Sequence, residues 1–144
     1  MFDPTQQDLK QILAELKDVR KDVRRTAVMK LGMVGGDDAL RALVRTLEND
    51  FEDLIVRGRA AMMLGKLGDT RAVEPLIRAL DAPGFQTPYQ AILSLGRLGD
   101  ARAIMPLLAV ATNSKDKTRE AALQALEKLG HEISTDVLAT EPEA

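Results

Sequence analysis

The chain of 144 residues has no cysteine and no tryptophan, and only one tyrosine, three phenylalanines and one histidine. The absence of cysteine excludes disulfides, thiolate metal sites and a cysteine nucleophile. With aromatic residues at 3%, the core must be built from Leu, Ala, Val, Ile and Met. Such side chains suit closely packed helices better than a β-sheet, so the composition favours one all-α domain.

The chain also lacks a surplus of positive charge and any long apolar run. Its formal net charge is −2 and its pI about 5.5, so no cationic field would attract nucleic acid. No N-terminal segment is typical of a signal peptide, and no apolar stretch approaches the ~20 residues of a membrane span. We therefore expect a cytoplasmic protein with no nucleic-acid partner and no membrane span.

One short pattern occurs four times along the chain. Four nine-residue segments align without gaps, and each ends in a glycine: 27–35 (AVMKLGMVG), 60–68 (AAMMLGKLG), 91–99 (AILSLGRLG) and 122–130 (ALQALEKLG). The closing glycines are 33, 31 and 31 residues apart. A fixed period of this length indicates stacked structural repeats rather than one irregular fold.

Each copy of the pattern predicts a helix. In the second copy Val56, Ala60, Leu64 and Leu67 recur at helical spacing and predict one buried stripe. The closing glycine can take the left-handed conformation that ends a helix, and an aspartate follows it directly in Gly68-Asp69 and Gly99-Asp100. We therefore expect a second apolar helix to begin at each aspartate.

Prolines lie inside the helices that follow. Pro75 and Pro106 stand about one and a half turns after the predicted helix starts, where the missing N–H should bend the helix. A further start signal, Asp3-Pro4-Thr5-Gln6, predicts a helix before the first copy.

The sequence therefore predicts an α-solenoid of about four helical hairpins in one domain, residues 1–130. The hairpins are expected at about residues 4–35, 37–68, 70–99 and 101–130. Residues 131–144 are polar and acidic and are interpreted as a flexible tail, whose last four residues, Glu141 to Ala144, also match a short affinity tag.

The residues of the second copy resemble those of a known family. From Val56-Arg57 through Ala60, Leu64-Gly65 and Gly68-Asp69 to Pro75-Leu76, the pattern resembles the HEAT repeat, in its short PBS-lyase HEAT-like (E-Z type) form. The resemblance covers about residues 20–130. It implies stacked helical hairpins whose second helices offer a binding face.

Two copies depart from this pattern. The third has Thr87-Pro88 in place of Val56-Arg57, preceded by Pro83-Gly84-Phe85, so we expect a rebuilt hairpin loop. The fourth has Glu127 where the others have Gly32, Gly65 and Gly96, which we expect to be exposed. Glu127 and the absence of a following helix are typical of a polar C-terminal cap.

Two kinds of enzyme with similar repeats suggest catalytic functions that this chain could have. The E-Z repeats resemble those of deoxyhypusine hydroxylase, where several His-Glu pairs hold two irons, but this chain has one such pair, His131-Glu132. The resemblance also extends to phycobilin lyases, which attach open-chain tetrapyrroles to phycobiliproteins. We predict no catalytic, cofactor-binding or metal-binding residue. A role as an accessory, assembly or lyase-like factor for phycobiliproteins stays open.

Charged residues at the helix ends have a structural interpretation. Asp18, Asp22, Asp37, Asp69 and Asp100 are expected to cap helices. Arg24, Arg57 and Arg119 occupy equivalent positions and are expected to bond neighbouring aspartates or loop carbonyls.

The exposed side of the second helices is the candidate binding surface. If Val56, Ala60, Leu64 and Leu67 point inward, positions 58, 62 and 66 point outward. This gives three rows across the repeats: Arg25, Gly58, Tyr89, Glu120; then Met29, Met62, Leu93, Gln124; then Met33, Lys66, Arg97, Lys128.

The middle row would place large apolar side chains in solvent, which is typical of an interface. We therefore predict a noncatalytic scaffold that binds another protein through Met29, Met62, Tyr89 and Leu93, with Arg59 and Arg97 at the rim. The alternative is that the row is buried within the superhelix or against a symmetry mate. The sequence does not indicate an oligomeric state.

Overall fold

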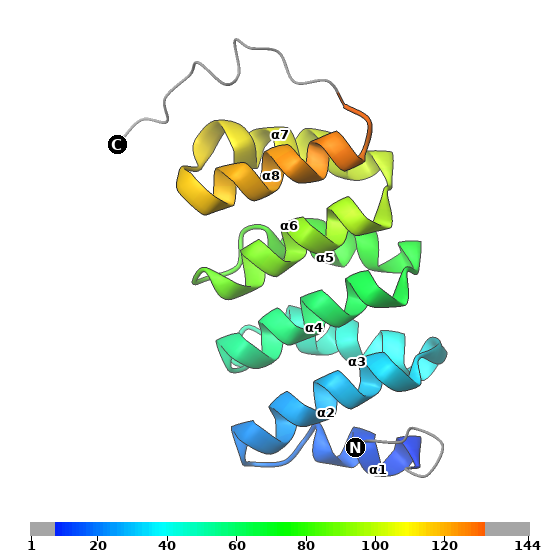
Figure 1. Cartoon of the computed structure of the whole chain (residues 1–144). Coiled ribbons are helices and arrows are strands. Elements are labelled where there is room, and N and C mark those ends of the chain that lie inside the picture. The colour runs from blue at the N-terminus through cyan, green and yellow to red at the C-terminus, as the bar shows by residue number, and fades with distance from the viewer. Residues whose placement is uncertain (1–7, 132–144) are drawn as a thin grey trace.

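The computed structural model describes residues 8–131, which form four helical hairpins (Figure 1). The first helices of the hairpins are α1 (Leu9–Glu15), α3 (Gly36–Glu48), α5 (Val73–Ala79) and α7 (Ile104–Asn113). The second helices are α2 (Lys21–Val34), α4 (Leu54–Leu67), α6 (Gln86–Leu98) and α8 (Asp116–Lys128). The predicted all-α solenoid is confirmed.

Two predicted features lie outside the described residues. These are the start signal Asp3 to Gln6 and most of the tail, residues 132–144. The helix α1 begins at Leu9, and its N-cap is Asp8, whose carboxylate accepts a hydrogen bond from the backbone N–H of Lys10 at 3.1 Å.

The hairpins stack into two layers. In Figure 1 the second helices α2, α4, α6 and α8 form one layer of successive rungs, and the first helices lie behind them. The core between the layers repeats with the sequence, because equivalent leucines are fully buried in each hairpin: Leu31, Leu64, Leu95 and Leu126 on the second helices, and Leu43, Leu76 and Leu107 on the first. Burying each of these side chains stabilises the fold by roughly 1.5–3 kcal/mol.

The junctions between hairpins follow the predicted stop and start signals. Gly68 and Gly99 close α4 and α6 in the left-handed conformation, with φ of 72° and 69°. The carboxylates of Asp69 and Asp100 then accept from the N–H groups of Arg71 and Arg102, both at 2.9 Å. Stop and start therefore occupy adjacent residues, which keeps each junction short.

The first helices of the third and fourth hairpins are divided rather than bent. A 3₁₀ turn, η1 (Thr70–Ala72) or η2 (Ala101–Ala103), precedes α5 and α7. Pro75 and Pro106 follow as the third residues of those α-helices. Because proline has no N–H to donate to the carbonyl four residues earlier, the α-helical bonding starts only after the turn. The predicted bend within one continuous helix is replaced by this division.

Three glycines set the spacing of the second helices, and the prediction that they are exposed is wrong. Gly65 and Gly96 are buried and Gly32 is half-buried. A Cβ on Gly65 would lie 2.6 Å from Cβ and 2.9 Å from Cα of Ser94, and one on Gly96 would lie 3.0 Å from Cα of Ala125. Each glycine thus lets the next second helix approach more closely than any side chain would permit.

The two layers are packed unequally. Each second helix packs extensively on the next, whereas α5 and α7 make hardly any direct contact. The stack must therefore curve with the second helices on its inner side. Within residues 8–131, no helix combines the length and the hydrophobicity needed to cross a membrane.

Replacing Gly65 by alanine tests this packing. Its new Cβ would overlap Ser94 and strain the buried hydrogen bond from Ser94 Oγ to the Ala61 carbonyl, which is 2.6 Å long. We expect Gly65→Ala to lower the free energy of unfolding by about 1–3 kcal/mol in urea denaturation. The equivalent residue of the last repeat, Glu127, is exposed, so Glu127→Ala should change it by less than about 0.5 kcal/mol. Equal effects of the two variants would contradict the role given to Gly65.

Candidate functional site

The inner surface of the solenoid is formed by two rows of side chains from the second helices. The middle row contains Met29, Met62 and Leu93, and the outer row contains Met33, Lys66, Arg97 and Lys128. We call these seven residues the second-helix face. Its rows run across successive helices because equivalent positions recur in every repeat.

The apolar side chains of the middle row are half-buried. Met29, Met62 and Leu93 pack their inner atoms against the core and leave the rest open to solvent, whereas Gln124, which continues the row on α8, is exposed. The row is therefore neither fully exposed, as the helical wheel suggested, nor part of the buried core. Its apolar character ends at the last repeat.

The helical wheel predicts that positions 58, 62 and 66 of α4 point outward, and this prediction is right for position 66 and wrong for position 58. Lys66 is exposed as expected, but Gly58 is buried against α6, where a Cβ would lie 3.3 Å from Cβ of Gln86. Beside this contact a hollow of about 340 Å³ opens between α4 and α6, lined by Ile55, Gly58, Arg59, Met62, Gln86 and Gln90. Met62 therefore forms part of a shallow concave surface.

An aromatic pair stands at the loop end of α6. The ring of Tyr89, which is half-buried, stacks on that of Phe85, with 4.9 Å between centroids and 21° between planes. Phe85 is 52% exposed and was not among the predicted binding residues. Its place in the rebuilt segment Pro83-Gly84-Phe85 was the sequence signal that could have identified it, since a loop aromatic has no helical stripe to join.

The two arginines predicted at the rim, Arg59 and Arg97, differ in how free they are to bind a partner. Arg59 is half-buried, and its Nη1 donates to the backbone carbonyl of Arg25 at 3.3 Å, so it ties α4 to α2. Arg97 is exposed, as are Lys66 and Lys128. None of these three cations makes an ion pair with any residue between 8 and 131. Within the described residues the outer row thus offers three unpaired positive charges, one in each of the last three repeats.

Ion pairs hold the loop end of the face in place. The Arg25 guanidinium donates to both carboxylate oxygens of Asp53, at 2.9 and 3.0 Å, and Asp53 also caps α4 through the N–H of Val56. The hydrogen bond from Arg25, with a further contribution from that of Val56, outweighs desolvation and lowers the pKa of Asp53 to about 2. A second pair, Arg24 with Glu52, lies beside it at 3.0 Å.

The predicted roles of the helix-end charges are confirmed in part. Asp69 and Asp100 cap as expected, but Asp37 instead accepts from Arg71 Nη2 of the next repeat at 2.8 Å. Arg24 bonds the loop carbonyls of Asp18 and Val19, as expected, whereas Arg57 bonds the carbonyl of Leu47 at the end of α3. These aspartates and arginines therefore stabilise helix ends and contacts between repeats.

Features of a catalytic centre are few in the described part of the chain. Between residues 8 and 131 no three His, Cys, Asp or Glu side chains gather to hold a metal ion. The backbone N–H of His131 bonds the Leu126 carbonyl at 3.0 Å, which closes the end of α8. The surface that combines apolar and charged groups is the second-helix face, and its geometry suits a macromolecular partner.

Comparison with known protein families agrees with this geometry. The family model for HEAT repeats matches residues 9–87 and 79–140. The chain belongs to the HEAT-repeat family. Among functionally curated proteins, no sequence match to this HEAT-repeat chain was found.

Two solved structures show the same arrangement of HEAT repeats. The complex of CpcE and CpcF of phycocyanin lyase from Nostoc sp. PCC7120 has a chain that is 30% identical, with a TM-score of 0.73 over 87% of this chain and 54% of that one. Human deoxyhypusine hydroxylase, in complex with glycerol, is 25% identical, with a TM-score of 0.72 over 87% of this chain and 44% of the other. This chain therefore spans about half the length of these two proteins.

The pH dependence of stability tests the clamp between Arg25 and Asp53. The folded pKa of about 2 lies below the ordinary 3.8, so the pair stabilises the fold above pH ~4 and ceases to do so as the pH falls towards 2. Asparagine caps a helix as well as aspartate but carries no charge. In urea denaturation, Asp53→Asn should be less stable than wild type at pH 7, and most of this deficit should disappear as the pH falls to 2.

Asp38 supplies a matched control for this measurement. It is exposed and makes no ion pair with any described residue. Since only the helix dipole acts on it, Asp38→Asn should lose less than about 1 kcal/mol of stability at pH 7, well below the loss of Asp53→Asn. If the deficit of Asp53→Asn persists unchanged at pH 2, the ion pair is not its cause.

Proposed function

We propose that this HEAT-repeat chain is a noncatalytic scaffold that binds another protein on its second-helix face. The observation that carries the proposal is the pairing of a half-buried apolar row with a parallel row of unpaired cations. Side chains such as Met62 and Leu93 already have their inner atoms packed, so a partner would bury the remainder without ordering a mobile loop. Low ordering cost favours binding.

The charges of the outer row add selectivity to this surface. Lys66, Arg97 and Lys128 lie near the C-terminal ends of α4, α6 and α8, where a cation is also favoured by the helix dipole. Interaction with the helix dipole leaves the N–H groups of these three side chains available to donate hydrogen bonds to a partner. A partner with an apolar stripe flanked by carboxylates would match both rows, and the charges would speed its association.

A second candidate function is an accessory, assembly or lyase-like role for phycobiliproteins. It is supported by the 30% identity to a chain of the complex of CpcE and CpcF of phycocyanin lyase. The likeness extends over 54% of that chain, so a whole lyase activity does not follow from it. Mixing this protein with a bilin and an apo-phycobiliprotein separates the two candidates. A new visible absorbance that stays with the denatured phycobiliprotein would favour the second, and its absence the first.

Substitution of two apolar residues tests the binding face. Met62→Glu with Leu93→Glu should weaken partner binding by at least about tenfold, because two buried apolar contacts become charged. Helical circular dichroism should persist, since both side chains are only half-buried. The measurement is affinity capture from the native source, followed by titration of the captured protein in purified form.

Met105→Glu is the matched control for that experiment. Met105 is 73% exposed on α7, in the opposite layer, so its substitution makes the same chemical change away from the face. The purified partner should bind this variant as it binds wild type. Equal binding to all three proteins would refute the second-helix face as the docking surface.

A further inference from the structure

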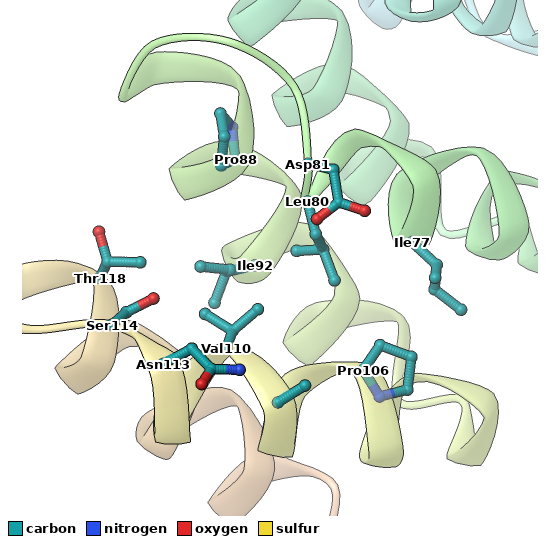
Figure 2. Close-up of a pocket in the computed structure, with 11 residues that line it drawn as sticks. Ile77, Leu80, Asp81, Pro88, Ile92, Pro106, Val110, Asn113, Ser114 and Thr118 are labelled. Carbon is teal, nitrogen blue, oxygen red and sulfur yellow. The ribbon is translucent and has the colours of Figure 1, made fainter. Parts of the chain in front are cut away.

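A pocket of about 310 Å³ lies between the first helices of the last two hairpins. Figure 2 shows Leu80, which directly follows α5, Ile92 of α6 and Val110 of α7 pointing towards one another across it. Asn113, Ser114 and Thr118 stand at one end, and Ile77 and Pro106 at the other. The pocket exists because α5 and α7 hardly touch, and it lies in the layer opposite the second-helix face.

The same place in the preceding repeat is a smaller pocket, of about 220 Å³. Equivalent residues line the two, as the glycine-to-glycine alignment shows. Leu47 corresponds to Leu80, Glu48 to Asp81, Arg57 to Pro88, Pro75 to Pro106 and Arg78 to Ala109. The chain therefore contains two versions of one site, and they differ in their charged residues.

Two arginines of the chain itself line the smaller pocket, which belongs to the earlier repeat. Arg57 is 4% exposed, and its Nε donates to the Leu47 carbonyl at 3.1 Å while its Nη2 lies 3.8 Å from Asp50. Arg78 Nη2 adds a pair with Glu48 at 3.2 Å. A site of this shape therefore accommodates a guanidinium with its methylene stem, which bonds a helix-end carbonyl and a carboxylate.

A guanidinium also occupies the equivalent position in the first repeat. Arg24 donates to the loop carbonyls of Asp18 and Val19 and to the Glu52 carboxylate. The fourth repeat has Arg119 there. The third repeat, with Pro88, is thus the only one of the four whose sequence places no arginine at this position.

The later version of the site has lost the arginines but kept two of their three acceptors, the carbonyl at Leu80 and one carboxylate, Asp81. Pro88 and Ala109 are too short to cross the gap. Asp81 is exposed and pairs with no cation among the described residues, and the Leu80 carbonyl accepts no hydrogen bond from any residue in that range. The result is an apolar slot with a carboxylate and a free carbonyl at its edge.

We propose that this pocket binds an arginine side chain of a partner protein. The apolar walls, Leu80, Ile92 and Val110, cover the methylene stem, and the guanidinium takes the hydrogen bonds that Arg57 and Arg78 make one repeat earlier. A purely apolar group would use neither the Asp81 carboxylate nor the Leu80 carbonyl at the edge of the pocket. The ammonium of lysine could not present the planar fork that bonds carbonyl and carboxylate together.

The probe for this proposal is N-acetyl-arginine amide, which mimics an arginine within a chain. Titrated into the full-length protein, it should produce saturable amide shifts in ¹H–¹⁵N spectra at Asp81, Val110 and Ser114, with millimolar affinity. The neutral analogue N-acetyl-citrulline amide should produce none. Binding of free arginine without binding of the blocked form would assign the site to the amino acid and overturn the proposal.

Two variants locate the binding. Pro88→Arg rebuilds the arrangement of Arg57, so the protein's own guanidinium should exclude the probe. Asp81→Asn should weaken binding of the probe by about two- to fivefold, the loss expected for one ion pair at an exposed carboxylate. Asp50→Asn is the control, because in that smaller pocket Arg57 already donates to the helix-end carbonyl of Leu47, and the variant should bind the probe as wild type does.

Dispersed spectra of each variant establish that it is folded. The proposal is wrong if the citrulline analogue shifts the same amides, or if Asp81→Asn binds as wild type does. Since Asp81 is exposed, Asp81→Asn keeps the test decisive even if Pro88→Arg fails to fold.

Discussion

The close approach of successive second helices is the constraint on which the other features of this protein depend. Gly32, Gly65 and Gly96 remove the Cβ atoms that would hold these helices apart. The first helices pack on one another far less closely, so their layer spreads while the inner layer closes. That difference brings Met29, Met62 and Leu93 together as one row and leaves a gap behind them, between α5 and α7.

Because each repeat touches only its neighbours, a change in one repeat alters one junction and leaves the stack intact. At the junction of the second and third hairpins, Arg57 and the pair of Arg78 with Glu48 leave only a smaller pocket. At the next junction Pro88 and Ala109 leave the corresponding space open. Individual repeats can therefore acquire binding sites without loss of the shared core.

Ion pairs orient the loop ends more than they stabilise the fold. Exposed pairs such as Arg71 with Asp37 contribute little free energy in water. The less exposed clamp of Arg25 on Asp53 fixes the start of α4 against α2, and thereby the position of Met62 relative to Met29. Binding by this face would then need little rearrangement, as suits a scaffold of the HEAT-repeat family.

The sequence by itself determined the all-α solenoid of about four hairpins, the glycines that end α4 and α6 and the caps Asp69 and Asp100, because helical periodicity and turn chemistry are local properties of the chain. It also identified the apolar row of Met29, Met62 and Leu93, since equivalent positions recur in each repeat. Only the tertiary structure decided that Gly58 and Gly65 are buried, that Arg59 bonds the Arg25 carbonyl, and that Pro88 leaves a pocket. These outcomes depend on distances between neighbouring repeats, which no pattern within one repeat encodes.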